Sequence, residues 1–217
     1  MRKARDEKYQ WGEPPACVDM APDVIVSPDT QKEDRLPPGQ TRTRKWPVLD
    51  ASGTPSIDCD TWRLEIIGLV ERPIHFGLEE FKQLPRTRVF ADFHCVTRWS
   101  RLGNLWEGVA TQHVARQAGV RPEARFVVLH GCDRGWTTNL PLADFLGPDA
   151  LLADTHDGQP LSADHGGPVR AIIPQLYAWK SAKWLRAIEF SDVDRPGYWE
   201  QAGYHNHGDP WTEERFG

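Results

Sequence analysis

The stretch "TWRLEIIGLV" (residues 61–70) is the first part of the chain with a clear structural period. Its large apolar side chains, Trp62, Leu64 and Ile66, occupy every second position, which indicates a β-strand with one buried face. Further strands are predicted from apolar, valine- and isoleucine-rich runs at residues 125–131, 168–174 and 184–191.

Two helices are predicted between these strands. In residues 77–85, Leu78, Phe81 and Leu84 lie three apart, and a proline ends the run. Residues 109–119 have a helical apolar pattern that ends at a glycine, a common helix C-terminal residue. The chain also holds 18 glycines and 18 prolines, which indicates many turns. The predicted fold class is α+β, with mixed β-sheets, short helices and long loops.

Length and charge narrow the possible functions. The 217 residues suit one domain with an arm, and we expect a proline- and charge-rich arm at 1–45 and the domain at 46–217. The net charge of −5 and the pI near 5.9 argue against general nucleic-acid binding. The chain starts without an apolar signal region, and no stretch approaches the roughly 18 apolar residues of a membrane span. We therefore expect a cytoplasmic protein without a membrane span.

The stretch "FHCVTRWS" (residues 93–100) places the thiol of Cys95 among basic and aromatic residues. The simplest interpretation is a buried structural cysteine, since free cysteines are usually buried. Nearby positive charge would lower the thiol pKa, which leaves a nucleophile or a metal ligand open. If the segment is extended, His94 points to the opposite face and is a poor base. A zinc site would need further ligands, for which His205 and His207 are candidates, although a polar loop with two exposed histidines is the favoured interpretation of that segment.

The other cysteines, Cys17, Cys59 and Cys132, form no C-x-x-C pair with Cys95 or with each other. This spacing argues against a structural zinc knuckle or a thioredoxin-like motif.

Residues 165–184, "HGGPVRAIIPQLYAWKSAKW", indicate an anion-binding site. Arg170 lies inside an apolar strand and needs an anionic partner. Lys180 and Lys183 flank Ser181 and Ala182, a pattern compatible with a phosphate cradle or with a strand edge protected by lysines. In residues 131–142, Trp136 is either part of an ordinary hairpin loop or a pocket wall.

Taken in order, these motifs resemble the sulfite oxidase-like family of molybdopterin-dependent oxidoreductases. The resemblance spans about residues 40 to 192 and rests on the combination of C-V-x-x-W-S, G-P-V-R and K-S-A-K. It also uses "RKWPVLD" (44–50), "WRLEIIGLVERP" (62–73) and "LWEGV" (105–109).

The resemblance implies a cofactor of molybdenum and molybdopterin. By position, Cys95 matches the family cysteine whose thiolate binds molybdenum, a soft ligand for a soft site. Gly131 falls where a relative has threonine, so its contact with the pterin is either through the backbone or absent. The cofactor-binding positions implied in this way are Arg44, Lys45, Trp46, Cys95, Gly131, His165, Arg170, Ser181, Ala182 and Lys183.

The resemblance also implies a reaction, which is two-electron oxygen-atom transfer on a small substrate. That substrate is either a sulfite-like oxyanion or a sulfoxide or N-oxide. Cys95, Arg98 and Tyr177 are the candidate catalytic residues, with Trp136 and His94 as further pocket residues. Electrons would pass to or from a separate partner, and a monomer is expected. The alternatives are a non-catalytic molybdopterin-binding protein and, more remotely, a zinc or cysteine-nucleophile hydrolase.

The chain departs from sulfite oxidases proper in several ways. The residues after Phe190 are too few for an immunoglobulin-like domain, so we expect them to wrap the catalytic domain. We expect no haem domain before the core, and no clear oxyanion-binding arginine stands near Arg44. In pattern, the chain resembles the short, stand-alone sulfite oxidase-like proteins more than it resembles sulfite oxidases proper.

Overall fold

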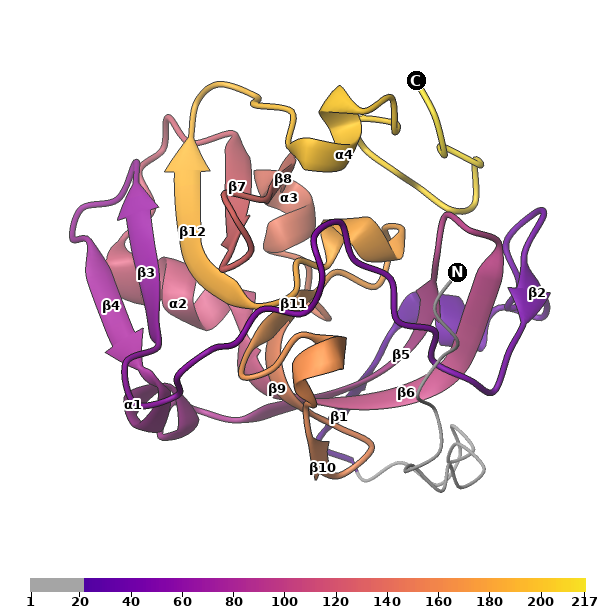
Figure 1. The fold of residues 1–217 in the computed structure, drawn as a ribbon, viewed down its shortest axis with the longest axis horizontal. Helices are drawn as coiled ribbons and strands as arrows, with labels where there is room; N and C mark the ends of the chain where they lie inside the picture. Colours follow the sequence, from indigo (N-terminus) through magenta and orange to yellow (C-terminus); the bar gives the residue numbers. More distant parts are fainter. Residues whose placement is uncertain (1–21) are drawn as a thin grey trace.

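A computed structural model describes residues 22–217 of the chain, and these residues form two β-sheets with short helices around them (Figure 1). Cys17 and most of the expected arm lie outside the described residues. The first sheet contains β4 (Ile74–Gly77), β3 (Arg63–Gly68), β12 (Leu185–Ser191), β7 (Phe126–Gly131) and β8 (Thr137–Pro141), in that order. β12 is parallel to β3 and antiparallel to β7.

The predicted period of residues 61–70 is confirmed in β3. Leu64 and Ile66 are fully buried, whereas Arg63 and Glu65 between them are exposed. The indole Nε1 of Trp62 donates to the carbonyl of Leu185 at 3.0 Å and so ties the start of β3 to β12. The strands predicted at 125–131, 168–174 and 184–191 are also present, the second only as the short β11 (Arg170–Ile172).

The second sheet is built on a long hairpin of β5 (Thr87–His94) and β6 (Trp99–Ala110), followed by β9 (Leu151–His156) and β10 (Gln159–Pro160). β11 pairs with β9. This hairpin was not predicted from the sequence. Val89 to His94 are buried without a break, so neither face shows the alternation that marks a strand. The turn of this hairpin is the Cys95 segment.

Residues 22–45 form part of the same sheet. β1 (Val24–Val26) pairs in parallel with β5, and β2 (Thr41–Arg42) pairs in parallel with β6. The side chain of Arg35 binds Asp92, inside β5, at 2.5 and 2.9 Å. Residues 36–40 contain a turn, in which the amide of Gln40 donates to the carbonyl of Pro37 at 3.2 Å. The boundary between an arm and a domain at 45/46 stays a prediction.

Both predicted helices are present, each shorter than expected. α1 (Leu78–Lys82) begins at Gly77, whose amide donates to the carboxylate of Glu80 at 2.7 Å. α2 (Thr111–Ala118) ends at Gly119, which has a φ of 68°. The remaining helices are α3 (Leu142–Phe145), α4 (Tyr198–Gln201) and the 3-10 turns η2 (Pro28–Gln31), η3 (Ala163–His165) and η4 (Ala178–Lys180).

The residues after β12 run across the ends of both sheets (Figure 1). They pass from α4 to an isolated bridge between Tyr204 and Phe216. Trp211 Nε1 donates to Asp29 at 2.7 Å, and Arg215 donates to the carbonyl of Val96 at 2.7 Å. The end of the chain therefore contacts both the N-terminal segment and the Cys95 turn.

Gly108 lies in β6 and pairs with Ala153 of β9, next to a shift in the register of the two strands. A Cβ atom at this position would overlap the backbone carbonyl of Leu152. We expect Gly108→Ala to lower the free energy of unfolding by about 2 kcal/mol or more, because neither backbone can move apart without breaking the sheet. Chemical denaturation measures this. Gly77→Ala is the matched control, since its added Cβ meets only ordinary contacts. Equal stability of the two variants would contradict the expectation.

Candidate functional site

Cys95 lies at the tip of the β5–β6 hairpin, in a tight turn. Its amide donates to the carbonyl of Trp99 at 2.9 Å, and its carbonyl accepts from the amide of Arg98 at 3.0 Å. Arg98 has a φ of 74°, a conformation that non-glycine residues seldom adopt. The turn fixes the thiol, whose sulfur lies 3.2 Å from the Thr97 hydroxyl.

The surroundings of the Cys95 thiol are more apolar than the sequence suggested. The residue is 8% exposed, and burial raises the pKa of its thiol, which outweighs the lowering by hydrogen bonds with Thr97 and by the charge of Arg215. Arg98, the basic neighbour expected to favour the thiolate, has an exposed side chain. A thiol in this environment is a poor free nucleophile and needs a metal or another partner to hold its charge.

His94 is not a base for Cys95. Its ring is fully buried on the other side of the strand, with Nδ1 2.8 Å from the Ser100 hydroxyl. Burial lowers the pKa of His94 to about 4, so the ring is neutral near pH 7. It also does not line the cleft beside Cys95, where it was a candidate.

Beside Cys95 lies a cleft with about 960 Å³ of space, part of it open to solvent. The cleft is bordered by the Cys95 turn, by residues 46–51, by the loop after β7 and by residues 164–184. Its side chains with ionisable or hydroxyl groups are Asp50, Cys95, Thr97, Asp133, Asp164, His165, Arg170, Ser181, Lys183 and Tyr204.

Arg170 provides a buried positive charge at one side of this cleft. Its guanidinium donates to the carbonyls of His165 at 2.8 Å and Ser181 at 2.9 Å. Within residues 22–217 no carboxylate forms an ion pair with it. Burial lowers the pKa of Arg170 to about 9, which shows how costly the unneutralised charge is. An anion in the cleft would relieve this cost.

Lys183 and Ser181 lie on the same side of the cleft as Arg170. The Lys183 ammonium donates to the carbonyl of Asp164 at 3.2 Å, and burial, followed by repulsion from Arg170, lowers its pKa to about 8. The Ser181 hydroxyl accepts from the amide of Ile173 at 2.9 Å, which fixes the segment against β11. One short stretch of chain therefore places two cations, Arg170 and Lys183, on the same side of the cleft.

His165 and Trp46 form a stacked pair next to Arg170. Their ring centroids are 3.9 Å apart, and His165 Nε2 lies 3.1 Å from the carbonyl of Trp46. Burial lowers the pKa of His165 to about 4, so it is a neutral hydrogen-bonding group near pH 7. The Arg170 guanidinium lies 5.6 Å from the Trp46 ring centroid, within reach of a cation–π contact.

Comparison with known proteins identifies the family. Residues 51–199 match the oxidoreductase molybdopterin binding domain. The chain belongs to this molybdopterin-binding family. An uncharacterized oxidoreductase of Bacillus subtilis, YuiH, is 48% identical over 86% of this chain and 94% of its own length. The crystal structure of the sulfane dehydrogenase SoxCD from Paracoccus pantotrophus is similar with a TM-score of 0.63 and 25% identity, over 67% of this chain and 42% of that one.

Two more distant relatives have named activities. A putative protein-methionine-sulfoxide reductase subunit of Azospira oryzae is 31% identical over 69% of this chain and 56% of its own length. The mitochondrial sulfite oxidase of Drosophila melanogaster is 31% identical over 69% of this chain and 30% of its own length. This chain therefore spans about half or less of these larger relatives.

The sulfite oxidase-like resemblance and the α+β fold are thereby confirmed. The chain is a molybdopterin-dependent oxidoreductase, and its cofactor is molybdenum with molybdopterin. The residues of the cleft fit such a group. The buried guanidinium of Arg170 and the ammonium of Lys183 can bind an anion, and the Cys95 thiol lines the same cleft. A pterin phosphate would supply the anion, and a thiolate is a suitable molybdenum ligand.

The structure brings six of the predicted cofactor-binding residues to the cleft and leaves four outside its lining. Those that line it are Trp46, Cys95, His165, Arg170, Ser181 and Lys183. Arg44 and Lys45 have exposed side chains, while Ala182 is buried in the core beneath β11. Gly131 lies behind the lining, where a Cβ would overlap the carboxylate of Asp133. The roles assigned to these residues stay predictions.

The two remaining candidate catalytic residues, Arg98 and Tyr177, also lie outside the lining. Tyr177 is fully buried and stacks on Trp179, with ring centroids 5.4 Å apart. The Arg215 guanidinium lies 5.1 Å from the centroid of the Tyr177 ring. Trp136, in contrast, does line the cleft, as its sequence context suggested.

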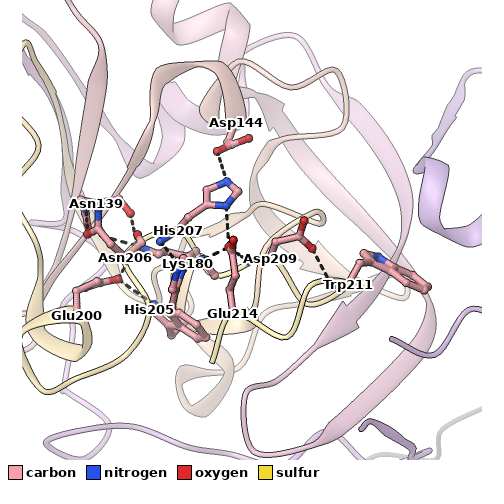
Figure 2. A network of polar contacts seen from close by, with 12 residues as sticks. Asn139, Asp144, Lys180, Glu200, His205, Asn206, His207, Asp209, Trp211 and Glu214 are labelled. Atoms are coloured by element: carbon pink, nitrogen blue, oxygen red, sulfur yellow. Dashed lines mark hydrogen bonds and ion pairs between the residues drawn. The ribbon is translucent and has the colours of Figure 1, made fainter. Parts of the chain in front are cut away.

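Lys180 is not part of a phosphate cradle. Its side chain is fully buried, and its ammonium lies 2.6 Å from the Glu200 carboxylate (Figure 2). The same nitrogen donates to the carbonyls of Asn139 at 2.7 Å and Asn206 at 2.6 Å. The 3-10 turn before Ser181 directs Lys180 away from the cleft, so it anchors the C-terminal residues.

His205 and His207 are held by carboxylates. His207 lies between Asp144, 3.1 Å from Nε2, and Glu214, 2.9 Å from Nδ1 (Figure 2). His205 Nδ1 is 3.3 Å from the same Glu214. In residues 22–217 no three His, Cys, Asp or Glu side chains are arranged to hold a metal ion, so the zinc alternative finds no support there. The described residues also contain no helix long and apolar enough to cross a membrane.

Sequence reasoning missed the aromatic contribution of the C-terminal residues. Trp199 and Tyr204 line the cleft together with Trp179. The signal available in the sequence was the density of aromatic residues in "YWEQAGYHNHGDPW" (198–211).

We expect Lys180→Met to lower the free energy of unfolding by about 3 kcal/mol or more, because it leaves the Glu200 carboxylate buried without its counter-ion. Adding Glu200→Gln should recover part of this loss, since the orphan charge is then removed. Chemical denaturation compares both with Lys82→Met, which breaks an exposed pair with Glu79 and should change stability little. Similar effects of the two lysine substitutions would contradict the structure.

From the surroundings of His207 we expect the free energy of unfolding to depend on pH. The hydrogen bond to Asp144, helped by Glu214, raises its pKa from 6.5 to about 9. The folded state therefore binds the proton of His207 more tightly than the unfolded state does. The contribution of protonated His207 to the free energy of unfolding is complete below pH 6.5 and is lost as pH rises through about 9.

The test is the difference in unfolding free energy between wild type and His207→Gln across this pH range. The difference should shrink as pH rises. His130→Gln, at a histidine whose pKa burial lowers, should not show this trend. A difference that is constant with pH would contradict the expectation.

Proposed function

We propose that this chain catalyses two-electron oxygen-atom transfer on a small substrate, with the Cys95 thiolate as a molybdenum ligand. One observation carries the proposal: the Cys95 thiol and the two cations Arg170 and Lys183 line the same cleft. A metal that is held by a phosphorylated pterin requires both a thiolate ligand and a binding site for an anion.

The chain's own residues divide this task. Arg170 and Lys183 bind the anionic part of the cofactor, and Ser181 holds their segment in place. Trp46 and His165 offer a flat surface and a neutral hydrogen-bonding group beside it. When bound, the molybdenum–pterin group supplies the two-electron redox chemistry. The buried, apolar surroundings of Cys95 favour a thiolate that is bound to a metal over a free one.

Arg98 and Tyr177 have supporting roles in this proposal. Arg98 closes the Cys95 turn through its backbone, and its exposed side chain can attract an anion from solvent. Tyr177 supports Trp179 from behind and so shapes the cleft wall.

The names of two relatives indicate two possible kinds of substrate. One is named a putative protein-methionine-sulfoxide reductase subunit and another a sulfite oxidase. We accordingly propose a sulfoxide or N-oxide, or a sulfite-like oxyanion, as substrate. Electrons are exchanged with a separate partner protein, and the catalytic unit is a monomer.

Two alternatives predict different results. A non-catalytic binder would hold molybdopterin without turning over sulfite, sulfoxides or N-oxides in the presence of an artificial electron carrier. A cysteine-based hydrolase would have a Cys95 that alkylating reagents modify rapidly in cofactor-loaded protein, whereas a metal-bound thiolate resists them.

Metal analysis tests the proposal directly. We expect protein from a molybdopterin-competent host to contain stoichiometric molybdenum and to show redox turnover. Cys95→Ala should lose turnover and most of its molybdenum, because the thiolate ligand is gone. Cys59→Ala is the matched control, since Cys59 is exposed and outside the cleft.

Wild-type protein without molybdenum, or a Cys95→Ala variant with full metal content and turnover, would contradict the proposal. Zinc in place of molybdenum would favour a zinc enzyme.

A further inference from the structure

A run of cations lies in the segment that leads to the cleft. From residue 35 to residue 49 the chain has four cations and no carboxylate, although its net charge is −5. Three of these cations, Arg42, Arg44 and Lys45, have exposed side chains. Lys45 directly precedes Trp46, the first residue of the segment that borders the cleft. The local charge here is therefore opposite in sign to that of the whole chain.

β2 holds these cations beside the Cys95 turn. It pairs in parallel with β6, with Arg42 opposite Ser100. The amide of Thr41 donates to the carbonyl of Arg98 at 2.9 Å. Because Arg98 is part of the Cys95 turn, these backbone contacts fix the cationic segment next to the turn that carries the thiol.

The charge of this segment is not cancelled by ion pairs with the described part of the chain. Within residues 22–217 no carboxylate forms an ion pair with Arg42 or Lys45. On α1, by contrast, the exposed Lys82 pairs with Glu79 at 2.8 Å. Arg42 and Lys45 therefore present their positive charge to solvent.

Two carboxylates lie in the neighbourhood. Asp50 is exposed and lines the cleft. Glu213 lies beside Arg98, since a Cβ atom added at Gly39 would meet both side chains. The positive charge offered to a partner is therefore that of the three cations at 42–45, and Arg98 adds less to it.

Apolar side chains extend this surface to the mouth of the cleft. Val48 is 36% exposed and Leu49 is 54% exposed, and they are two of the five large hydrophobic side chains that residues 22–217 expose to this degree. Both line the cleft. Protein interfaces commonly combine an apolar centre with a polar rim. We call Arg42, Arg44, Lys45, Val48 and Leu49 the entrance surface.

We propose that the entrance surface docks the electron carrier, and that this carrier is a small protein with a carboxylate-rich face around its redox centre. This inference rests on the proposed function and specifies its partner. A protein that exchanges electrons with a group in the cleft has to approach the mouth of the cleft, where these residues lie. Opposite charges on the two surfaces speed the encounter and orient it.

The electron balance requires two docking events for each turnover. Each carrier exchanges one electron. Reduction of a substrate XO to X and water consumes two electrons and two protons, so it oxidises two reduced carriers. Oxidation of X by water releases the same electrons and protons and reduces two oxidised carriers.

Rapid mixing of molybdenum-loaded protein with a reduced acidic flavodoxin measures the electron exchange without any substrate. We expect Arg42→Glu to lower the second-order rate constant roughly tenfold at low salt and to change it little at about 0.5 M salt, because ions screen the attraction. Arg63→Glu is the matched control. It makes the same charge change at an exposed arginine of β3, at the opposite end of the molecule from β2 (Figure 1), and should leave the rate constant unchanged.

Cross-linking locates the contact without depending on redox activity. A carbodiimide joins an ammonium to a carboxylate that touches it. Among the lysines in residues 22–217, we expect Lys45 to be the one linked to the flavodoxin, whereas Lys82 on α1 should not be linked. Mass spectrometry identifies the linked peptide, and Lys45→Met should remove the link.

Absence of both the Lys45 cross-link and the salt-dependent exchange in molybdenum-loaded protein would overturn the docking surface and leave the proposed function intact. Faster exchange with a basic c-type cytochrome would overturn the charge of the partner. Binding to anionic lipid vesicles that Arg42→Glu abolishes, without exchange with flavodoxin, would assign the surface to a membrane instead. Failure of the proposed function itself is recognised separately, by the absence of molybdenum from the wild-type protein.

Discussion

A buried guanidinium with no carboxylate partner among residues 22–217 is the constraint on which this cleft depends. Arg170 begins β11 and is held by two backbone carbonyls, from the segments before and after it. The geometry of those segments fixes where Ser181 and Lys183 lie. Keeping such a charge buried costs free energy, which an anionic cofactor would offset. If Arg170 binds the cofactor as proposed, stability and cofactor binding are linked at this residue.

The cleft has two sides of different chemistry, and each comes from a different kind of structural element. The cationic side is built on β11 and the turn after it, and both pack against the hydrophobic core. The aromatic side includes Trp199 and Tyr204 from the C-terminal segment, and Lys180 holds that segment in place. Cys95 lies at the hairpin tip where the two sides meet.

The sequence predicted what depends on local periodicity. β3 and α2 have one buried face each, so their patterns were visible. The hairpin of β5 and β6 was not, because β5 is buried on both faces. Cys95, Arg170 and Lys183 could be grouped only through the order of motifs along the chain, since they are far apart in sequence. The opposite directions of Lys180 and Lys183 depend on a single 3-10 turn that spacing alone does not reveal.

The position of Trp199, Tyr204 and Arg215 in the chain has a consequence for biosynthesis. These residues follow every strand of both sheets, yet they complete the wall beside Cys95 and support its turn. A ribosome-bound chain can therefore form its sheets before the cleft has its final shape. During that interval the cationic side of the cleft and Trp179 are present, while Trp199 and Tyr204 of the aromatic side are still missing.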